Sequence, residues 1–152
     1  MHCRDCFERI RFQALEVAGI EDDVAQCEAR AQIKGGAPGG GGGGTGDPMA
    51  AMDRAIDLST ELDMLKAKLN RRIEAATQIL YGQDGRGGLA KAKGTTTADI
   101  LCRYYLQGGA WDEIASEVAD PESKAPKKWC QMRARRALDY MEREGGRSIS
   151  KL

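Results

Sequence analysis

The sequence predicts an all-α protein, and three patterns lead to this prediction. Apolar residues recur at three- and four-residue steps over long stretches, which is the period of one helix face. Glycine and proline gather in a few short segments that separate these stretches. Of the 152 residues, 5% are aromatic and 30% are charged, a composition that suits helices joined by thin apolar stripes rather than one large core.

Residues 1–34 form the first predicted segment, with one amphipathic helix over residues 3–34 and Gly19 as its weakest position. Its apolar stripe skips one turn at Glu21 and consists of Phe7, Ile10, Ala14, Val17, Val24 and Ala31. A stripe this narrow is typical of a coiled-coil seam, so the helix needs a partner helix.

His2, Cys3 and Cys6 at the start of this helix are the only pattern that suggests a metal. A Cys-x-x-Cys pair supplies two thiolates at a spacing compatible with zinc, but a structural zinc site needs four ligands and Cys27 is distant. We therefore predict no metal and no cofactor. The odd number of cysteines, five, fits reduced thiols, and Cys102 and Cys130 are predicted to pack as small apolar side chains.

Residues 35–47 are predicted to be a flexible linker, because residues 35–46 contain nine glycines and very little apolar surface. The segment lacks the Lys and Ser or Thr that complete a phosphate-binding loop. Its expected role is to let the first helix fold back antiparallel on the next one.

Residues 48–81 are predicted to form a long heptad helix, on the order of 50 Å in length. Its seam consists of Ala55, Leu58, Leu62, Leu65, Leu69, Ile73, Ala76 and Leu80. The first helix can cover this seam in a hairpin within one chain, or a second copy can cover part of it in a homodimer. We favour self-association, because a dimeric DNA reader gains a second half-site.

Residues 82–96 are predicted to be a flexible connector, because glycine is frequent there, with a candidate turn of helix at residues 89–92. Its cations Arg86, Lys91 and Lys93 could contact phosphate, although such charges more often solvate a loop.

Residues 97–145 are predicted to form three helices, over 97–106, 111–118 and from Pro126 to 144, followed by a tail over 146–152. Thr97 is expected to cap the first helix, and glycines at 108 and 109 to end it. The second helix is expected to bury Trp111, Ile114, Ala115 and Val118. The third is expected to pack on Ile114 and Val118 through Trp129, Cys130, Ala134, Ala137, Leu138 and Met141.

Charge is unevenly distributed in this region, although the formal net charge of the whole chain is zero. Residues 97–120 contain five acids and one base, whereas residues 124–136 contain six bases and no acid. Basic charge is therefore concentrated on the third helix, which indicates an acidic partner such as nucleic acid.

The segment YYLQGGAWDEIA at residues 104–115, followed by Ala137 and Leu138 inside a basic helix, resembles the last two helices of sigma factor region four. It also resembles small phage-borne, sigma-like transcriptional regulators of the ArpU/RinA type. These regulators contain a helix, a variable loop, a long heptad helix and a helix-turn-helix. The predicted order of elements in this chain is similar over nearly its whole length. This resemblance implies sequence-specific binding of double-stranded DNA, transcriptional regulation of phage or prophage genes, and host RNA polymerase as a candidate partner.

A helix-turn-helix places the first half of its recognition helix in the major groove. Here that helix is the third one, from Pro126 to 144, and its exposed residues are the candidate site residues. Lys127, Lys128 and Gln131 are predicted to reach base edges, with Arg135 one turn further along. Lys124, Arg133 and Arg136 are better placed for phosphates, which orient the protein on the duplex.

Other function classes have less support in the sequence. The only histidine is His2 near the chain end, so a nucleophile would have no base in a shaped site, and we expect no enzyme. A small terminase-like packaging protein, which also joins a helix-turn-helix to a coiled coil, is one alternative. A helical protein that binds or inhibits another protein is a second. No apolar run long enough for a membrane span or signal peptide occurs, and the expected location is the cytoplasm of a bacterial host.

Overall fold

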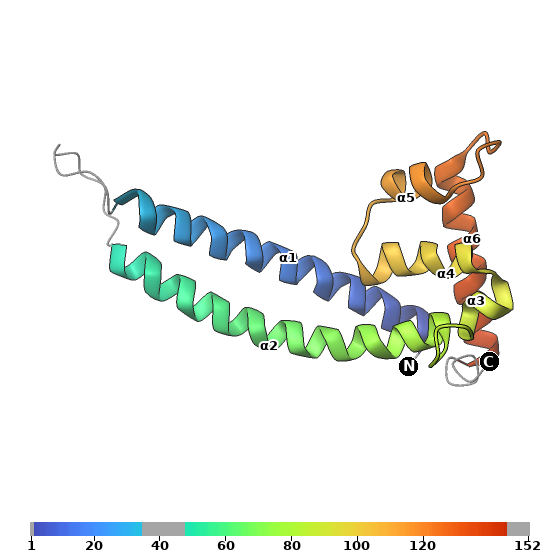
Figure 1. Cartoon of the computed structure of the whole chain (residues 1–152), viewed down its shortest axis with the longest axis horizontal. Helices are drawn as coiled ribbons and strands as arrows, with labels where there is room; N and C mark the ends of the chain where they lie inside the picture. Colours follow the sequence, from blue (N-terminus) through green and yellow to red (C-terminus); the bar gives the residue numbers. More distant parts are fainter. Residues whose placement is uncertain (1, 35–47, 146–152) are drawn as a thin grey trace. The chain divides into compact units, whose positions relative to one another are not determined.

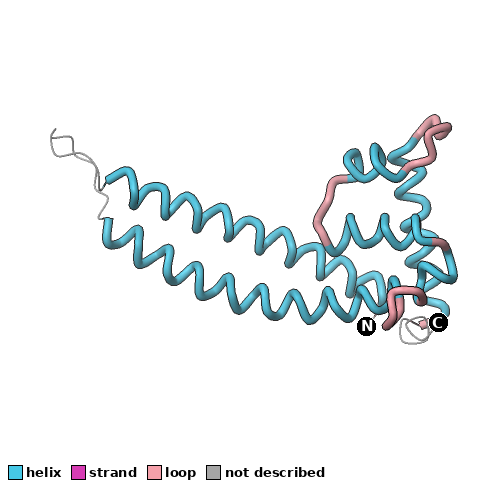
Figure 2. The backbone as a smooth tube through the Cα atoms, in the orientation of Figure 1, coloured by secondary structure: helices cyan, strands magenta, loops and turns pink. Residues whose placement is uncertain are grey.

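The computed structural model describes residues 2–34 and 48–145, and all regular elements in this part of the chain are helical (Figure 1 and Figure 2). The all-α prediction is therefore confirmed there. The elements are α1 (Cys3–Lys34), α2 (Pro48–Tyr81), α3 (Gly88–Lys93), α4 (Thr95–Leu101), the π-helical turn η1 (Cys102–Leu106), α5 (Trp111–Val118) and α6 (Pro126–Glu144). The predicted linker over 35–47 and tail over 146–152 lie outside the described residues.

The chain divides into two compact units. Unit 1 contains residues 1–14 and 69–152, and unit 2 contains residues 15–68. The helices α1 and α2 are each divided between the two units.

Unit 2 is a pair of antiparallel helical segments, one from α1 and one from α2 (Figure 1). Val17 and Val24 of α1 and Ala55 and Leu62 of α2 are buried, and each pair is seven residues apart. An ion pair between Lys66 and Glu21 also joins the segments. Other predicted seam residues, such as Leu58, are only half-buried, so one of the two heptad positions provides most of the buried contact.

Unit 1 holds the larger core, to which α1 and α2 contribute as well as α3 to α6. In it, α5 packs on α6, and α4 contacts both. The ring of Phe7 in α1 meets the ring of Tyr105 in a T-shaped contact with centroids 5.7 Å apart. The largest fully buried side chains in this core are Phe7, Ile10, Leu80, Leu89, Ile100, Leu101, Cys130 and Met141.

The connector over residues 82–96 contains the short helix α3 where one helical turn is expected, but the segment is part of unit 1 and contributes to its core instead of being a flexible connector. The side chain of Leu89 is fully buried, and the N–H of Gly87 donates to the carbonyl of Tyr81 at 2.8 Å. Glycine at 82 and 88 has positive φ, of 76° and 62°, which allows the chain to turn tightly enough for Leu89 to enter the core. The glycines here serve a compact turn rather than an open link.

The prediction that Thr97 caps a helix is wrong, because α4 begins two residues earlier, after Gly94. Thr97 is buried inside the helix, and its hydroxyl donates to the carbonyl of Lys93 at 3.0 Å. The helix continues through η1 to Leu106 as expected, and Gly108 follows with φ of 72°.

Candidate nucleic-acid interface

The segment between α5 and α6 is ordered by short polar contacts. The carboxylate of Asp120 accepts a hydrogen bond from the N–H of Glu122 at 3.0 Å, and the hydroxyl of Ser123 accepts one from the N–H of Ala125 at 3.4 Å. Pro126 then occupies the first turn of α6, where its missing N–H costs nothing. These contacts explain why α6 starts at the proline, as the sequence predicts.

The inner face of α6 is apolar and buried, and it consists of Cys130, Ala134, Ala137, Leu138 and Met141. Successive residues of a helix are about 100° apart, so the opposite face carries Lys128, Met132 and Arg135. All three are exposed. The packing of α6 therefore turns part of its basic charge outward.

Six of the seven predicted site residues are exposed: Lys124, Lys127, Lys128, Gln131, Arg135 and Arg136. The exposed set includes the cations nearest the start of α6, where a recognition helix enters a groove. Met132, which is 44% exposed, lies among them and was not among the candidates.

Arg133 is the exception, because it is half-buried and has partners within the protein. Its guanidinium lies 4.4 Å from the ring centroid of Trp129, and its Nη1 donates to the hydroxyl of Thr97 at 3.3 Å. Trp129, predicted as a core residue, is itself only half-buried under this guanidinium. Arg133 lies on the side of α6 that faces α4, which the sequence pattern did not reveal.

Lys127 forms an ion pair with Asp112 at 3.0 Å, which joins the starts of α6 and α5. Both side chains are more than half exposed, so the pair is screened by solvent and contributes little to stability. The ammonium group of Lys127 therefore stays accessible to solvent beside Asp112.

Trp111 was predicted to be buried, but it is half-buried and stacked at the edge of the core. The centroid of its ring lies 3.9 Å from the centroid of the Tyr104 ring. The guanidinium carbon of Arg11 lies 3.8 Å from the centroid of the same Tyr104 ring. Arg11 also donates to the carbonyls of Tyr104, at 2.5 Å, and Gly109, at 3.1 Å. These carbonyls lie where η1 ends, so a side chain from α1 satisfies helix-end groups of the DNA-binding candidate.

The start of α1 also lies beside α6, at the boundary between its buried and exposed faces. Gln131 and Arg135 line a small pocket of about 120 Å³ together with Arg4 and Glu8. Arg4 reaches further along α6 and pairs with Asp139 at 2.8 Å. Sequence reasoning assigned α1 only to the hairpin, because no local pattern links it to residues more than a hundred positions away.

Burial raises the pKa of two tyrosines and two cysteines in unit 1, Tyr81, Tyr105, Cys102 and Cys130. Burial raises the pKa of Tyr81 above its usual range, and the hydrogen bond that its hydroxyl donates to Asp99 at 2.5 Å adds to this shift. Burial also raises the pKa of the thiols of Cys102 and Cys130. A raised pKa keeps a thiol protonated, the opposite of what activates a cysteine nucleophile.

No group of three or more His, Cys, Asp or Glu residues in residues 2–34 and 48–145 gathers closely enough to hold a metal ion. Among the described helices, none combines the length and the apolar character that crossing a bilayer requires.

Comparison with known proteins found no matching family model, no similar curated protein and no similar solved structure.

Proposed function

We propose that this protein binds double-stranded DNA in a sequence-specific manner and regulates transcription of phage or prophage genes. In this proposal α5 and α6 form a helix-turn-helix that resembles sigma factor region four. The base-reading residues are Lys127, Lys128 and Gln131, with Arg135 behind them. Contact with host RNA polymerase is a separate expectation from the resemblance.

The observation that carries the proposal is the two-sided character of α6. Its inner face is buried in unit 1, while Lys128, Gln131 and Arg135 remain exposed along the helix. A helix anchored on one side and basic on the other has the form that major-groove readout requires. This face is basic over the first half of α6, and the exposed acids Asp139 and Glu142 follow only in its second half.

The test is the affinity of the full chain for duplex fragments that tile its genomic neighbourhood. We expect preference for one fragment, with an affinity that falls steeply as salt rises, because phosphate contacts release counterions. Lys128→Glu is expected to weaken binding to that fragment by about tenfold or more, because one good base contact is worth about 1–3 kcal/mol.

Lys68→Glu is the matched control, since Lys68 is also exposed on a helix but lies in unit 2. Equal effects of the two substitutions, or no duplex binding at low salt, would contradict the proposal. Circular dichroism of both variants verifies that folding is unchanged. Light scattering of the complex separates a regulator, bound as a monomer or dimer, from a packaging protein, which would form a large ring.

We further propose that unit 2 carries a self-association surface for a second copy of the chain. Met52 and Ile56 are four residues apart on one helix face and are 50% and 57% exposed. They lie beside the seam rather than in it, so pairing of α1 with α2 does not cover them. Two such stripes facing each other would bury apolar surface and give the DNA-binding unit a partner half-site.

A further inference from the structure

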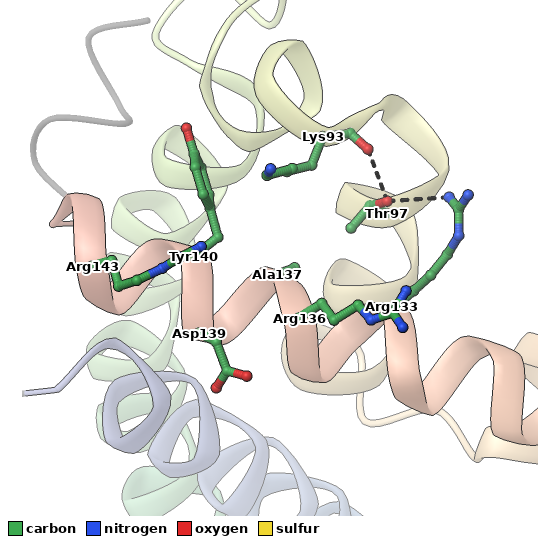
Figure 3. A pocket seen from close by; sticks show the side chains of 8 residues that line it. All are labelled: Lys93, Thr97, Arg133, Arg136, Ala137, Asp139, Tyr140 and Arg143. Atoms are coloured by element: carbon green, nitrogen blue, oxygen red, sulfur yellow. Dashed lines mark hydrogen bonds between the residues drawn. The ribbon is translucent and has the colours of Figure 1, made fainter.

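A groove between α6 and the α3–α4 segment concentrates positive charge in unit 1 (Figure 3). We call it the basic groove. Its volume is about 690 Å³, and the side chains that define its chemistry are Lys93, Thr97, Arg133, Arg136, Tyr140 and Arg143. Four of these six are cationic, and they come from elements on both sides of the groove.

Asp139 is the only carboxylate in the lining of the basic groove, and another residue engages it. Arg4 of α1 pairs with this carboxylate at 2.8 Å. In Figure 3 the carboxylate points away from Lys93 and Thr97. The four cations of the lining are therefore not balanced by an acid that faces them within the groove.

Two of these cations are held in place by aromatic rings. Lys93 Nζ lies 4.3 Å from the ring centroid of Tyr140, and the guanidinium of Arg133 rests on Trp129. Thr97, which is 5% exposed, accepts a hydrogen bond from Arg133 and donates one to the carbonyl of Lys93. An aromatic face positions a cation without neutralising its charge, so both remain available to an anion.

We infer that the basic groove binds a phosphate group. Guanidinium groups match phosphate oxygens with paired hydrogen bonds, and an ammonium group adds a point charge. The volume falls in the range of about 300–1,000 Å³ typical of small-ligand pockets, so a diphosphate fits. The phosphate comes either from the backbone of bound DNA, in which case the inference rests on the proposed function, or from a free small anion.

The first experiment is a calorimetric titration of the full chain with inorganic pyrophosphate, without DNA and at about 0.15 M ionic strength, where exposed charges more than about 8 Å from the anion are largely screened. We expect saturable binding. Arg136→Gln should weaken it by about tenfold, since a hydrogen bond to a charged group is worth about 1.5–3 kcal/mol. Lys93→Gln, on the other side of the groove, should have a similar effect.

Arg135→Gln is the matched control, because it removes the same charge from the neighbouring position of α6 without touching the basic groove. Its pyrophosphate affinity should stay within about twofold of the unsubstituted chain, as expected for a distant exposed charge. Absence of saturable binding, or equal losses from Arg135→Gln and Arg136→Gln, would overturn the inference. Arg136 is exposed, so circular dichroism should show an unchanged fold.

A second experiment identifies the source of the phosphate, with duplex affinity measured at constant ionic strength with and without saturating pyrophosphate. If the DNA backbone occupies the groove, pyrophosphate weakens duplex binding, and Arg136→Gln lowers the salt slope by about one. If a free anion occupies it, duplex affinity does not change. Both results presuppose that the chain binds pyrophosphate in the first experiment. If the chain binds pyrophosphate but no duplex, the proposed DNA-binding function is contradicted and the phosphate site is not.

Discussion

Gly88 illustrates how a single residue determines the path of the chain between α2 and α4. Its φ is +62°, and a Cβ at this position would lie 2.7 Å from both the nitrogen of Gly82 and the carbonyl oxygen of Ile79. Gly85 also has a positive φ, of 75°, but a Cβ there would have open space around it. An alanine at Gly85 therefore meets only the cost of the backbone conformation, whereas an alanine at Gly88 meets this cost and a steric clash.

We predict that Gly85→Ala destabilises the protein by about 1 kcal/mol, the cost of a left-handed conformation for a residue with a Cβ. Gly88→Ala should destabilise the protein by about 1–3 kcal/mol more than Gly85→Ala does, because the neighbouring backbone must shift to admit the methyl group. Urea unfolding of both variants measures the difference. Equal midpoints would show that the turn at Gly88 relaxes without cost.

The start of α1 is the element whose role differs most from its sequence pattern. Its stripe predicts only a hairpin with α2, and Gln13 does accept a hydrogen bond from Arg72 there. The same segment also places Phe7 and Ile10 in the core of unit 1 and brings Arg11 to the end of η1. The DNA-binding candidate is thus completed by residues from the opposite end of the chain.

We predict that Phe7→Ala destabilises unit 1 by about 3–5 kcal/mol, the usual cost of removing a buried aromatic ring. Phe12→Ala is its control, because Phe12 is 69% exposed on the same helix and should change stability by less than about 0.5 kcal/mol. Thermal unfolding followed by the fluorescence of Trp111 and Trp129 reports on unit 1. Similar midpoints for the two variants would contradict the role assigned to the start of α1.

At the scale of the whole molecule, the distribution of charge and apolar surface matters more than the totals. The formal net charge is zero, yet six cations and no acid lie between residues 124 and 136. Exposed apolar side chains such as Met52 and Ile56 lie in unit 2. The two surfaces lie in different units, which allows DNA binding and self-association to be tested separately.

We predict that Ile56→Glu shifts the protein toward the monomer, because it places a charge in the proposed contact between copies. Light scattering over a concentration series measures the shift. Ala50→Glu adds the same charge at another exposed position of α2 and should leave the association unchanged. A monomeric unsubstituted chain at all concentrations would exclude the self-association surface.

The sequence by itself determined where most of the helices lie, although not the extent of α3 or the start of α4, because apolar period, proline and glycine are local signals. Examples are α5, whose bounds match the predicted segment, and the buried inner face of α6 from Cys130 to Met141. The exposed basic residues near the start of α6 follow from the same pattern. A local pattern states which face of a helix is apolar but not which element covers it.

Only the tertiary structure decided what covers each face. It brought Arg11 to the carbonyl of Tyr104, 93 positions away, and Arg133 to Thr97, 36 positions away. It also gathered Lys93, Tyr140 and Arg143 with Arg136 in the basic groove. Tyr140 and Arg143 share one face of α6 with Arg136, a spacing visible in the sequence, but the packing of α6 beside Lys93 depends on contacts between distant segments.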